Sequence, residues 1–281
     1  MKVKILGSGG GEGFPALFCR CNNCENARKL GGRNIRTCSQ TLINDELLID
    51  LPMDTISHSL NSGMCFGDYK SVLITHTHID HFAPTLLRFR GGVYAHNLKH
   101  QKINIYGPDN IKSVFDLTNS GFGEVPEHIM ENINLVTLKD KTPVFIDGYT
   151  VIPLKALHAP NLGSFNYAII KDGKSVLYLL DSGYPEKETL SYLSSLNITF
   201  NCVVLDATMG VSPVNAYKYH MGFEENKMLK EELISLNIAN EETVFIASHI
   251  THNKAGTHDE IEKIFSGTGI IVAHDGLEVE V

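Results

Sequence analysis

One short segment of the chain contains four side chains that can bind a metal ion. It reads His-Thr-His-Ile-Asp-His from residue 76 to residue 81, and it directly follows the apolar run 71–75. A run of this kind is typical of a buried strand. Imidazole suits zinc, iron and nickel, whereas carboxylate suits harder ions such as manganese. The mixture therefore predicts a pair of first-row metal ions at the end of a strand, rather than a polar loop that is rich in histidine by chance.

Three further candidate ligands also follow apolar runs. His158, Asp181 and His249 stand where the runs 151–157, 176–180 and 244–248 end. In open α/β sheets, sites gather outside the carboxyl ends of the strands, so these side chains are expected at one edge. Taken singly, each is also typical of a turn or cap. Together with segment 76–81 they supply five histidines and two aspartates, enough for two adjacent metal ions.

The elements that would position these residues alternate along the chain. A hairpin is expected to turn on Asn44-Asp45, between two short apolar runs. Because strands occur in both halves with helices between them, we expect two sheets sandwiched by helices, in one domain over residues 1–281 with two similar halves. The predicted strands are 3–6, 40–43, 47–50, 71–75, 103–106, 133–138, 149–154, 165–170, 176–180, 202–205, 244–247 and 270–273, and the predicted helices are 53–60, 186–195, 224–236 and 259–265.

Composition narrows the classes of function. The chain has 281 residues, of which 43% are hydrophobic, and a formal net charge of −8. No apolar run has the length needed to cross a bilayer, and glycines interrupt the first one too early for a secretory signal. An acidic balance disfavours extended contact with nucleic-acid phosphates. We therefore expect a cytoplasmic protein with a small-molecule substrate, no membrane partner and no nucleic-acid partner.

Three of the six cysteines crowd together at Cys19, Cys21 and Cys24. Without an export signal, such a cluster favours a metal clip over a disulfide framework, and three reduced loop thiols are the alternative. The glycine-rich loop 7–13 matches neither a P-loop nor a dinucleotide fingerprint. We interpret that loop as a tight turn lining the pocket.

The ordered series of ligand-type residues resembles that of the metallo-β-lactamase-fold hydrolases. The resemblance implies an α/β fold, the four-layer αββα sandwich of that superfamily. Within it, the motifs 7–15 (Gly-Ser-Gly-Gly-Gly-Glu-Gly-Phe-Pro), Cys-x-Cys-x-x-Cys at 19–24, and Gly-Arg-Asn-Ile-Arg-Thr at 32–37 resemble the PhnP-type cyclic phosphodiesterases of the carbon–phosphorus lyase pathway. The similarity extends to Asp-Gly-Leu-Glu-Val at 275–279.

The resemblance assigns the ligands to two metal ions. It implies one ion held by His76, His78 and His158, a second held by Asp80, His81 and His249, and Asp181 bridging both. Asp80 would also take part in catalysis. A hydroxide shared by the metals would attack phosphorus in a small cyclic or diester phosphate, such as a ribosyl 1,2-cyclic phosphate. The donors accept Mn²⁺, Zn²⁺ or iron.

Four further residues have roles that the resemblance suggests. His220, in Tyr-His-Met-Gly at 219–222, matches the family histidine that protonates the leaving alkoxide, although the family motif is usually Gly-His-Met-Ser/Thr. A surface histidine at a helix N-terminus is the alternative. His252 resembles the fourth ligand of a structural zinc with the three cysteines. Asp50 either orients a ligating histidine or caps a strand. Asp206 is not expected to be a ligand.

Two other functions use almost the same ligands. The first is a tRNase Z-like nuclease, against which stand the acidic balance and the absence of a long glycine- and proline-rich arm. The second is a non-hydrolytic metal protein resembling PqqB, which shares the glycine loop and the cysteine clip. Seven intact ligands favour hydrolysis. A homodimer is an expectation from the family only.

Overall fold

The computed structural model describes residues 1–121, 123 and 125–281, and the strands of this described part form two seven-stranded sheets. The first sheet has the order β14-β1-β2-β3-β4-β5-β6. Strands β3 to β6 are parallel to one another, whereas β1, β2 and β14 are antiparallel to their neighbours. In that order the strands are Glu278–Glu280, Lys2–Gly7, Gln40–Ile43, Leu47–Ile49, Ser71–Leu73, Ile103–Gly107 and Ile133–Thr137.

The second sheet has the order β13-β12-β11-β10-β9-β8-β7. Its strands β10 to β13 are parallel, and antiparallel pairing of β9 with both β8 and β10 makes β8 parallel to β10. The strands in that order are Ile270–Val272, Val244–Ser248, Cys202–Asp206, Lys174–Leu179, Phe165–Lys171, Tyr149–Lys155 and Val144–Ile146.

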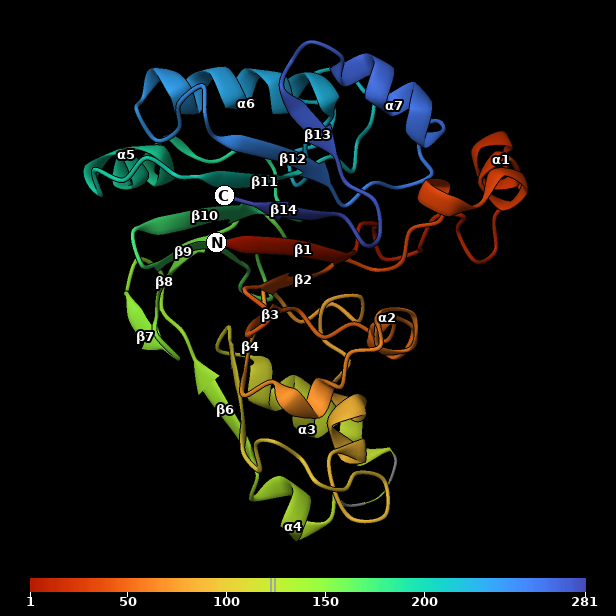
Figure 1. Cartoon of the computed structure of the whole chain (residues 1–281), viewed down its shortest axis with the longest axis vertical. Coiled ribbons are helices and arrows are strands. Elements are labelled where there is room, and N and C mark those ends of the chain that lie inside the picture. Colours follow the sequence, from red (N-terminus) through yellow and green to blue (C-terminus); the bar gives the residue numbers. More distant parts are fainter. Residues whose placement is uncertain (122, 124) are drawn as a thin grey trace.

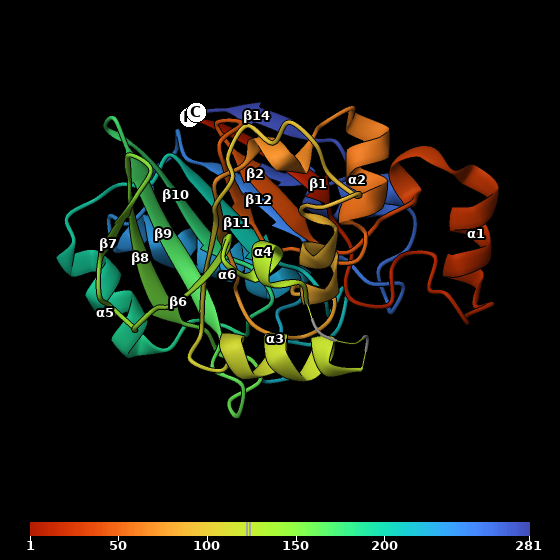
Figure 2. The ribbon, with the colours of Figure 1, turned by 90° about the horizontal axis from the view of Figure 1, so that it is seen from below.

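The two sheets pack face to face over an apolar core, and helices cover their outer faces (Figures 1 and 2). Side chains along a strand alternate between faces. In β11, Cys202 and Val204 therefore face the first sheet, whereas Val203 and Leu205 face the helices. The outcome is the predicted αββα sandwich.

Helices α5 (Lys187–Ser195), α6 (Phe223–Ser235) and α7 (His258–Phe265) cover the second sheet, at the top of Figure 1. Helices α2 (Thr55–Ser62) and α3 (Ile111–Ser120) lie on the outer side of the first sheet, with the 3₁₀ helix η3 (Pro84–Phe89). The remaining short helices are α1 (Asn22–Leu30), α4 (Glu127–Met130), η1 (Gly32–Asn34) and η2 (Phe66–Asp68). Among the described residues, no helix combines the length and the apolar character that a membrane span requires.

Most predicted elements are present within one or two residues of their expected bounds. The hairpin β2–β3 turns on Asn44 and Asp45, both in the left-handed region with φ of 52° and 57°. That conformation is the one a two-residue hairpin loop requires. The prediction missed β7, β14, α1, α3 and α4.

Candidate metal centre

The strands bring the candidate ligands to one edge of the sandwich. Segment 76–81 follows β4, and the other three candidates follow β8, β10 and β12. These four strands end at the same edge because parallel strands present their carboxyl ends together. The candidate ligands form two groups in which the ligand-type atoms lie within 4.8 Å of one another, and a third such group joins Asp181 and His249 to Asp206 and His220. One group is His76, His78, His158 and Asp181, and the other is Asp80, His81, Asp181 and His249.

Asp181 is the residue that the two groups share, and its Oδ2 atom lies at their junction. This oxygen is 3.2 Å from His76 Nε2, 3.1 Å from His81 Nε2 and 3.4 Å from His158 Nε2. It is 3.7 Å from His249 Nε2. One oxygen at similar distances from four imidazole nitrogens is placed to bridge two cations.

Two of the four nitrogens that face the junction have no hydrogen-bond partner within the described part of the chain. Among the described residues, Nε2 of His81 and Nε2 of His249 are buried and make no hydrogen bond. A buried polar atom left unpaired costs free energy. Bound cations would satisfy both nitrogens, so this donor set fits the divalent metal that the fold implies.

Neighbouring side chains leave those nitrogens free to bind metal. Nδ1 of His81 lies 2.7 Å from Asp50 Oδ2, so that its proton is donated to the carboxylate. Nδ1 of His249 pairs with Thr208 Oγ1 at 2.8 Å. Asp50 is fully buried and also accepts from the backbone N–H and the hydroxyl of Thr75. Partners of this kind fix the ring orientation and the tautomer of metal-binding histidines.

The charges of the cluster are strongly coupled. Burial opposes ionisation of Asp181, but His249, His220 and His81 outweigh it and hold the pKa of the carboxyl well below its usual range. Burial lowers the pKa of His76 well below its usual value, and charge on His81 lowers it further. The edge therefore presents an ionised carboxylate beside a neutral imidazole, which are the forms that bind metal.

Three residues of the site have a strained backbone. Asp50, Asp181 and His249 have φ values of 68°, 49° and 58°, in the left-handed region that non-glycine residues rarely adopt. Such strain persists only where the surrounding structure imposes it, and it gathers at functional sites. Each of these residues follows a strand directly or after one residue, so the left-handed turn aims its side chain along the edge.

The glycine-rich loop passes against the ligands, as a turn lining the pocket should. A Cβ atom on Gly11 would lie 2.8 Å from Asp80 Oδ2, and one on Gly10 would lie 2.8 Å from Thr251 Cγ2. Both contacts are too close for a side chain. The loop therefore approaches the centre only because it lacks side chains there.

His220 lies beside the shared carboxylate. Its Nδ1 is 3.1 Å from Asp181 Oδ1 and 3.2 Å from Asp206 Oδ2. The ring stacks on Tyr217, with centroids 5.6 Å apart. Burial alone would lower the pKa of His220, but the two carboxylates raise it to about 10. Asp206 also accepts from the N–H of Met221, so it holds the whole loop against the site.

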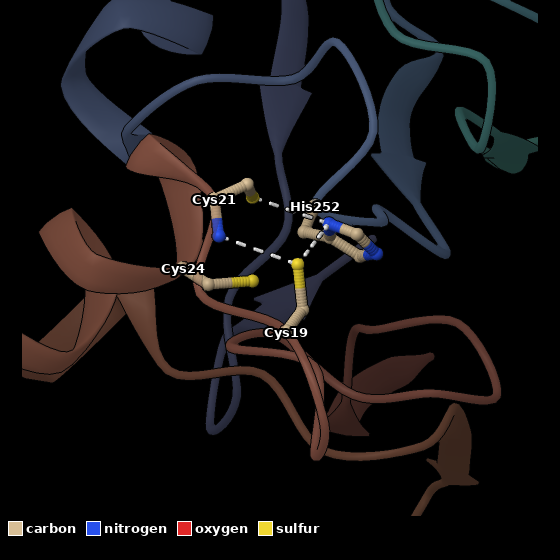
Figure 3. A group of neighbouring side chains, drawn as sticks. All are labelled: Cys19, Cys21, Cys24 and His252. Carbon is tan, nitrogen blue, oxygen red and sulfur yellow. Dashed lines mark hydrogen bonds between the residues drawn. The ribbon is translucent and has the colours of Figure 1, made fainter.

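The cysteine cluster forms a separate group of candidate ligands, outside the metal centre (Figure 3). Sγ of Cys19 and Sγ of Cys21 lie 3.7 Å and 3.5 Å from Nδ1 of His252. All four donor atoms, with Cys24, lie within 4.8 Å of one another. Zn–S bonds of about 2.3 Å and Zn–N bonds of about 2.0 Å at tetrahedral angles place such donors roughly 3.5 Å apart. The four residues therefore fit a closed zinc site.

The surroundings of the clip support metal binding. The N–H of Cys24 and the neighbouring His252 lower the pKa of the Cys21 thiol to about 6, against the opposing effect of burial. Glu12 Oε1 lies 3.5 Å from Nε2 of His252, on the side of the ring away from the sulfurs. The carboxylate thus favours the tautomer whose Nδ1 is free for the metal.

Sequence reasoning found the ligand-type residues and Asp50 but missed their supporting partners. Thr208 and Glu12 each contact a ligating histidine, and Thr75 holds Asp50. Thr208 follows Asp206 by two residues after a strand, a spacing that could have drawn attention to it. For Glu12, no signal in the sequence indicates that it meets a histidine 240 positions later.

Comparison with known proteins finds relatives of this chain. The sequence profile of the beta-lactamase superfamily domain matches residues 65–239, more than half of the chain. A curated octanoyltransferase from Porphyromonas gingivalis is 26% identical over 287 residues, covering 99% of this chain and 51% of that protein. A ribonuclease Z from Picrophilus torridus is 26% identical over 168 residues, covering 56% of this chain and 44% of that protein. The chain thus spans about half the length of the curated relatives it matches.

Solved structures share the fold along the whole chain. A diphosphatase described as a new member of the PhnP family has a TM-score of 0.75 and 20% identity, covering 100% of this chain and 97% of that one. Zinc-bound PqqB from Methylobacterium extorquens has a TM-score of 0.67 and 17% identity, covering 100% of both chains. At these identities the likeness establishes the metallo-β-lactamase fold.

Proposed function

The chain belongs to the beta-lactamase superfamily, and on that premise we propose that it is a metal-dependent phosphodiesterase acting on small cyclic or diester phosphates. The observation that carries the proposal is the position of Asp181 Oδ2, between two groups of ligand-type atoms. A pair of cations held so close together suits an in-line displacement at phosphorus.

Seven residues would hold the metals in the proposed enzyme. When bound, two divalent cations bring the pKa of a shared water towards neutrality and neutralise the oxygens of the reacting phosphate. Asp50 and Thr208 hold the imidazoles of His81 and His249 in the tautomer that binds metal. The glycine loop packs directly against Asp80 and so fixes its position at the edge. The ligands are His76, His78, His158 and Asp181 for one ion, and Asp80, His81, His249 and Asp181 for the other.

His220 is the proton donor in this proposal. Its Nδ1 is engaged by Asp206 and Asp181, so the proton on Nε2 is the one it can deliver to the leaving oxygen. The ring is 15% exposed, which gives substrate access to it. A donor fixed by two carboxylates stays protonated at neutral pH, as protonation of a leaving alkoxide requires.

A second candidate is a nuclease acting on tRNA precursors, which the match to a ribonuclease Z favours. A net charge of −8 weakens it, because nucleic-acid binding depends mainly on neutralising phosphates. In a non-hydrolytic role like that of PqqB, the two groups of metal ligands would catalyse no hydrolysis. The cysteine clip, with a zinc ion, would be structural in each case.

The test is a substrate screen with the manganese-loaded protein. We expect turnover of bis-p-nitrophenyl phosphate and of a ribosyl cyclic phosphate, and no cleavage of a precursor tRNA. Cleavage of the tRNA alone would replace the proposal by the nuclease. If protein with two bound metals turns over no diester, the phosphodiesterase proposal is wrong, whereas the family membership is unaffected.

Matched variants connect that turnover to the site. Asp181→Asn removes a metal-binding oxygen while keeping a side chain that accepts the left-handed backbone. Asp172→Asn makes the same change in an exposed turn, at φ 51°. We expect Asp181→Asn to lower kcat by more than about 100-fold, beyond the range typical of residues that only support ligands. Asp172→Asn should leave kcat unchanged.

A further inference from the structure

A cavity of about 510 Å³ lies on the outer face of the first sheet, away from the metal centre. Its floor includes Leu48, Val72 and Ile103 from β3, β4 and β5, and its walls come from α2 and η3. Loop residues 94–98 close the remaining side. None of the candidate metal ligands lines it. Its volume falls in the range of roughly 300–1,000 Å³ that is usual for small-ligand sites.

The rim of the cavity exposes large apolar side chains. Leu60 is 79% exposed, Tyr94 67%, Phe89 52% and Ile56 50%. Phe89 and Tyr94 pack edge to face, with ring centroids 5.4 Å apart. Exposed apolar residues gathered around an apolar hollow are typical of a binding site.

The hydroxyls of Thr55 and Ser59 in the lining are already engaged within the protein. Oγ1 of Thr55 accepts from Gln40 Nε2 at 3.1 Å, and Ser59 donates to the carbonyl of Met64 at 2.7 Å. The aliphatic floor offers no hydrogen bond either. A ligand inside would therefore contact mainly hydrocarbon, which suits an alkyl chain.

The cavity contains one cation whose hydrogen bonds are incomplete. Arg90 donates through Nη2 to the carbonyl of His100, while its Nε is buried with no acceptor among the described residues. Among the residues that the structure describes, no carboxylate lines the cavity. Residues 82–108 contain four lysines and arginines and no acidic residue, in a chain with a net charge of −8. This basic segment would attract an anion to the mouth of the cavity.

We propose that this cavity binds an anionic amphiphile, with its alkyl chain on the aliphatic floor and its carboxylate or phosphate head at Arg90. The head group would pair with the positive charge of the Arg90 guanidinium. The cavity is also connected to the metal centre, since Leu51 lines it and exchanges backbone hydrogen bonds with His81 and Ala83, each 2.8 Å long. The bound amphiphile thus lies one residue from the ligand-bearing loop.

Calorimetric titration of the metal-loaded protein tests the proposal, and the same titration of Asp181→Asn, which alters the metal centre, separates binding of the head group there from binding in the cavity. The probes are octanoate, decanoate and decyl phosphate at submicellar concentration. We expect one site per chain and a Kd that tightens about fourfold per added methylene, which corresponds to ~0.8 kcal/mol. Decanol and decyltrimethylammonium should bind at least tenfold more weakly. Equal affinity for decanol, or no saturable binding, overturns the proposal.

Two variants locate the site, and neither belongs to the metal centre. Arg90→Gln should weaken decanoate binding about tenfold or more, as expected for loss of a hydrogen bond to a charged group. Lys99→Gln removes the same charge from the same segment, outside the lining, and should change the Kd less than twofold. A diazirine-labelled fatty acid should crosslink to lining residues such as Leu86. Equal effects of the two variants, or labels at the metal centre, would overturn the assignment.

Because these measurements record binding in the cavity and not turnover, they are independent of the proposed function. Failure of amphiphile binding would leave the phosphodiesterase proposal untouched. Conversely, if the protein binds decanoate but hydrolyses no diester, only the phosphodiesterase proposal is contradicted.

Discussion

Two imidazoles at the metal centre depend on neighbours that decide which nitrogen faces the cations. For His81 that neighbour is Asp50, which is itself held by Thr75. For His249 it is Thr208. These contacts are as much part of the site as the ligands, since a rotated ring or the wrong tautomer cannot bind metal.

Asp50→Asn should weaken metal binding without unfolding the protein. Asparagine accepts the left-handed backbone at this position but lacks the negative charge that holds the proton of His81 Nδ1. We expect metal affinity to fall about 10–100-fold, measured by competition with a chelator. Asp45→Asn, in the exposed hairpin turn at φ 57°, is the matched control. Unchanged affinity would mean that Asp50 only caps its strand.

His220→Gln should reduce turnover and leave metal content intact. If this residue protonates the leaving oxygen, kcat should fall about 10²–10⁴-fold. Activated esters that leave without a proton should be affected far less. The exposed His128 provides the control His128→Gln. Full turnover with the poorer leaving group would leave His220 only a structural partner of Asp181 and Asp206.

The ligand-type residues could be predicted because each follows an apolar run that ends at one edge, as His158 and Asp181 do. The family resemblance also divided them into the two groups that the structure contains. Their role as ligands stays a prediction. Partners such as Glu12 could not be predicted, because a contact across 240 residues leaves no local pattern.

At the level of elements, the loop between β1 and α1 belongs to both metal sites. Its glycines approach Asp80, whereas Glu12 approaches His252. The conformation of this loop therefore determines the geometry of two centres at once.

Gly11→Ala should impair the metal centre although the residue binds nothing. The added Cβ would lie 2.8 Å from Asp80 Oδ2, so either the loop or the carboxylate must move. A displacement of this size is expected to cost on the order of 100-fold in kcat. Gly121→Ala is the matched control, since nothing lies within 4 Å of its added Cβ. Equal activity of the two variants would show that the loop can accommodate the added Cβ without disturbing the metal centre.

The clip anchors α1, which lies outside the two sheets in both views (Figures 1 and 2). Cys21→Ser should release about one zinc ion per chain and expose residues 16–35 to limited proteolysis. The reason is that α1 buries only Cys24 and Ala27. Cys65→Ser, at an exposed thiol, should retain zinc and resist proteolysis. Retention of zinc by Cys21→Ser would favour three reduced thiols over a metal site.

Strands were easier to predict than helices. The apolar runs of β10, β11 and β12 indicate buried strands directly, because both faces of the second sheet are covered. Helix α1 buries only Cys24 and Ala27, so it has no stripe of large apolar side chains from which a helix could be predicted. Strand β14, with only one partly buried residue, has no apolar pattern to detect.

For the whole molecule, the metal centre destabilises the folded state until metal ions are bound. His76, His81, His158 and His249 are buried with Asp181 at an edge that joins the two halves of the sandwich. Their mutual repulsion and unpaired nitrogens oppose folding in the absence of cations. The order of the layers could be predicted because strands occur in both halves of the sequence. The pairing of β14 with β1 could not be predicted, since it joins the two ends of the chain.

Removing the metals should therefore lower the thermal stability of the whole chain. We expect EDTA to decrease the Tm and Mn²⁺ to restore it. A free metal concentration of 100 times the Kd stabilises the folded state by about 2.7 kcal/mol per site. Asp181→Asn should respond much less to either treatment, as measured by scanning calorimetry. If the Tm of the unaltered protein changes with neither EDTA nor Mn²⁺, metal binding at this edge is contradicted.

Strands β14 and β1 also bring the first and last residues together, with the amino group of Met1 donating to the carbonyl of Val281 (Figure 1). The metal centre lies at the far end of β1, where the glycine loop begins. A fusion partner attached at either terminus would hence leave the mouth of the site unobstructed. The two ends could equally be tied by a short tether and the chain reopened at the exposed Asp172-Gly173 turn, giving a circular permutant with the same layers.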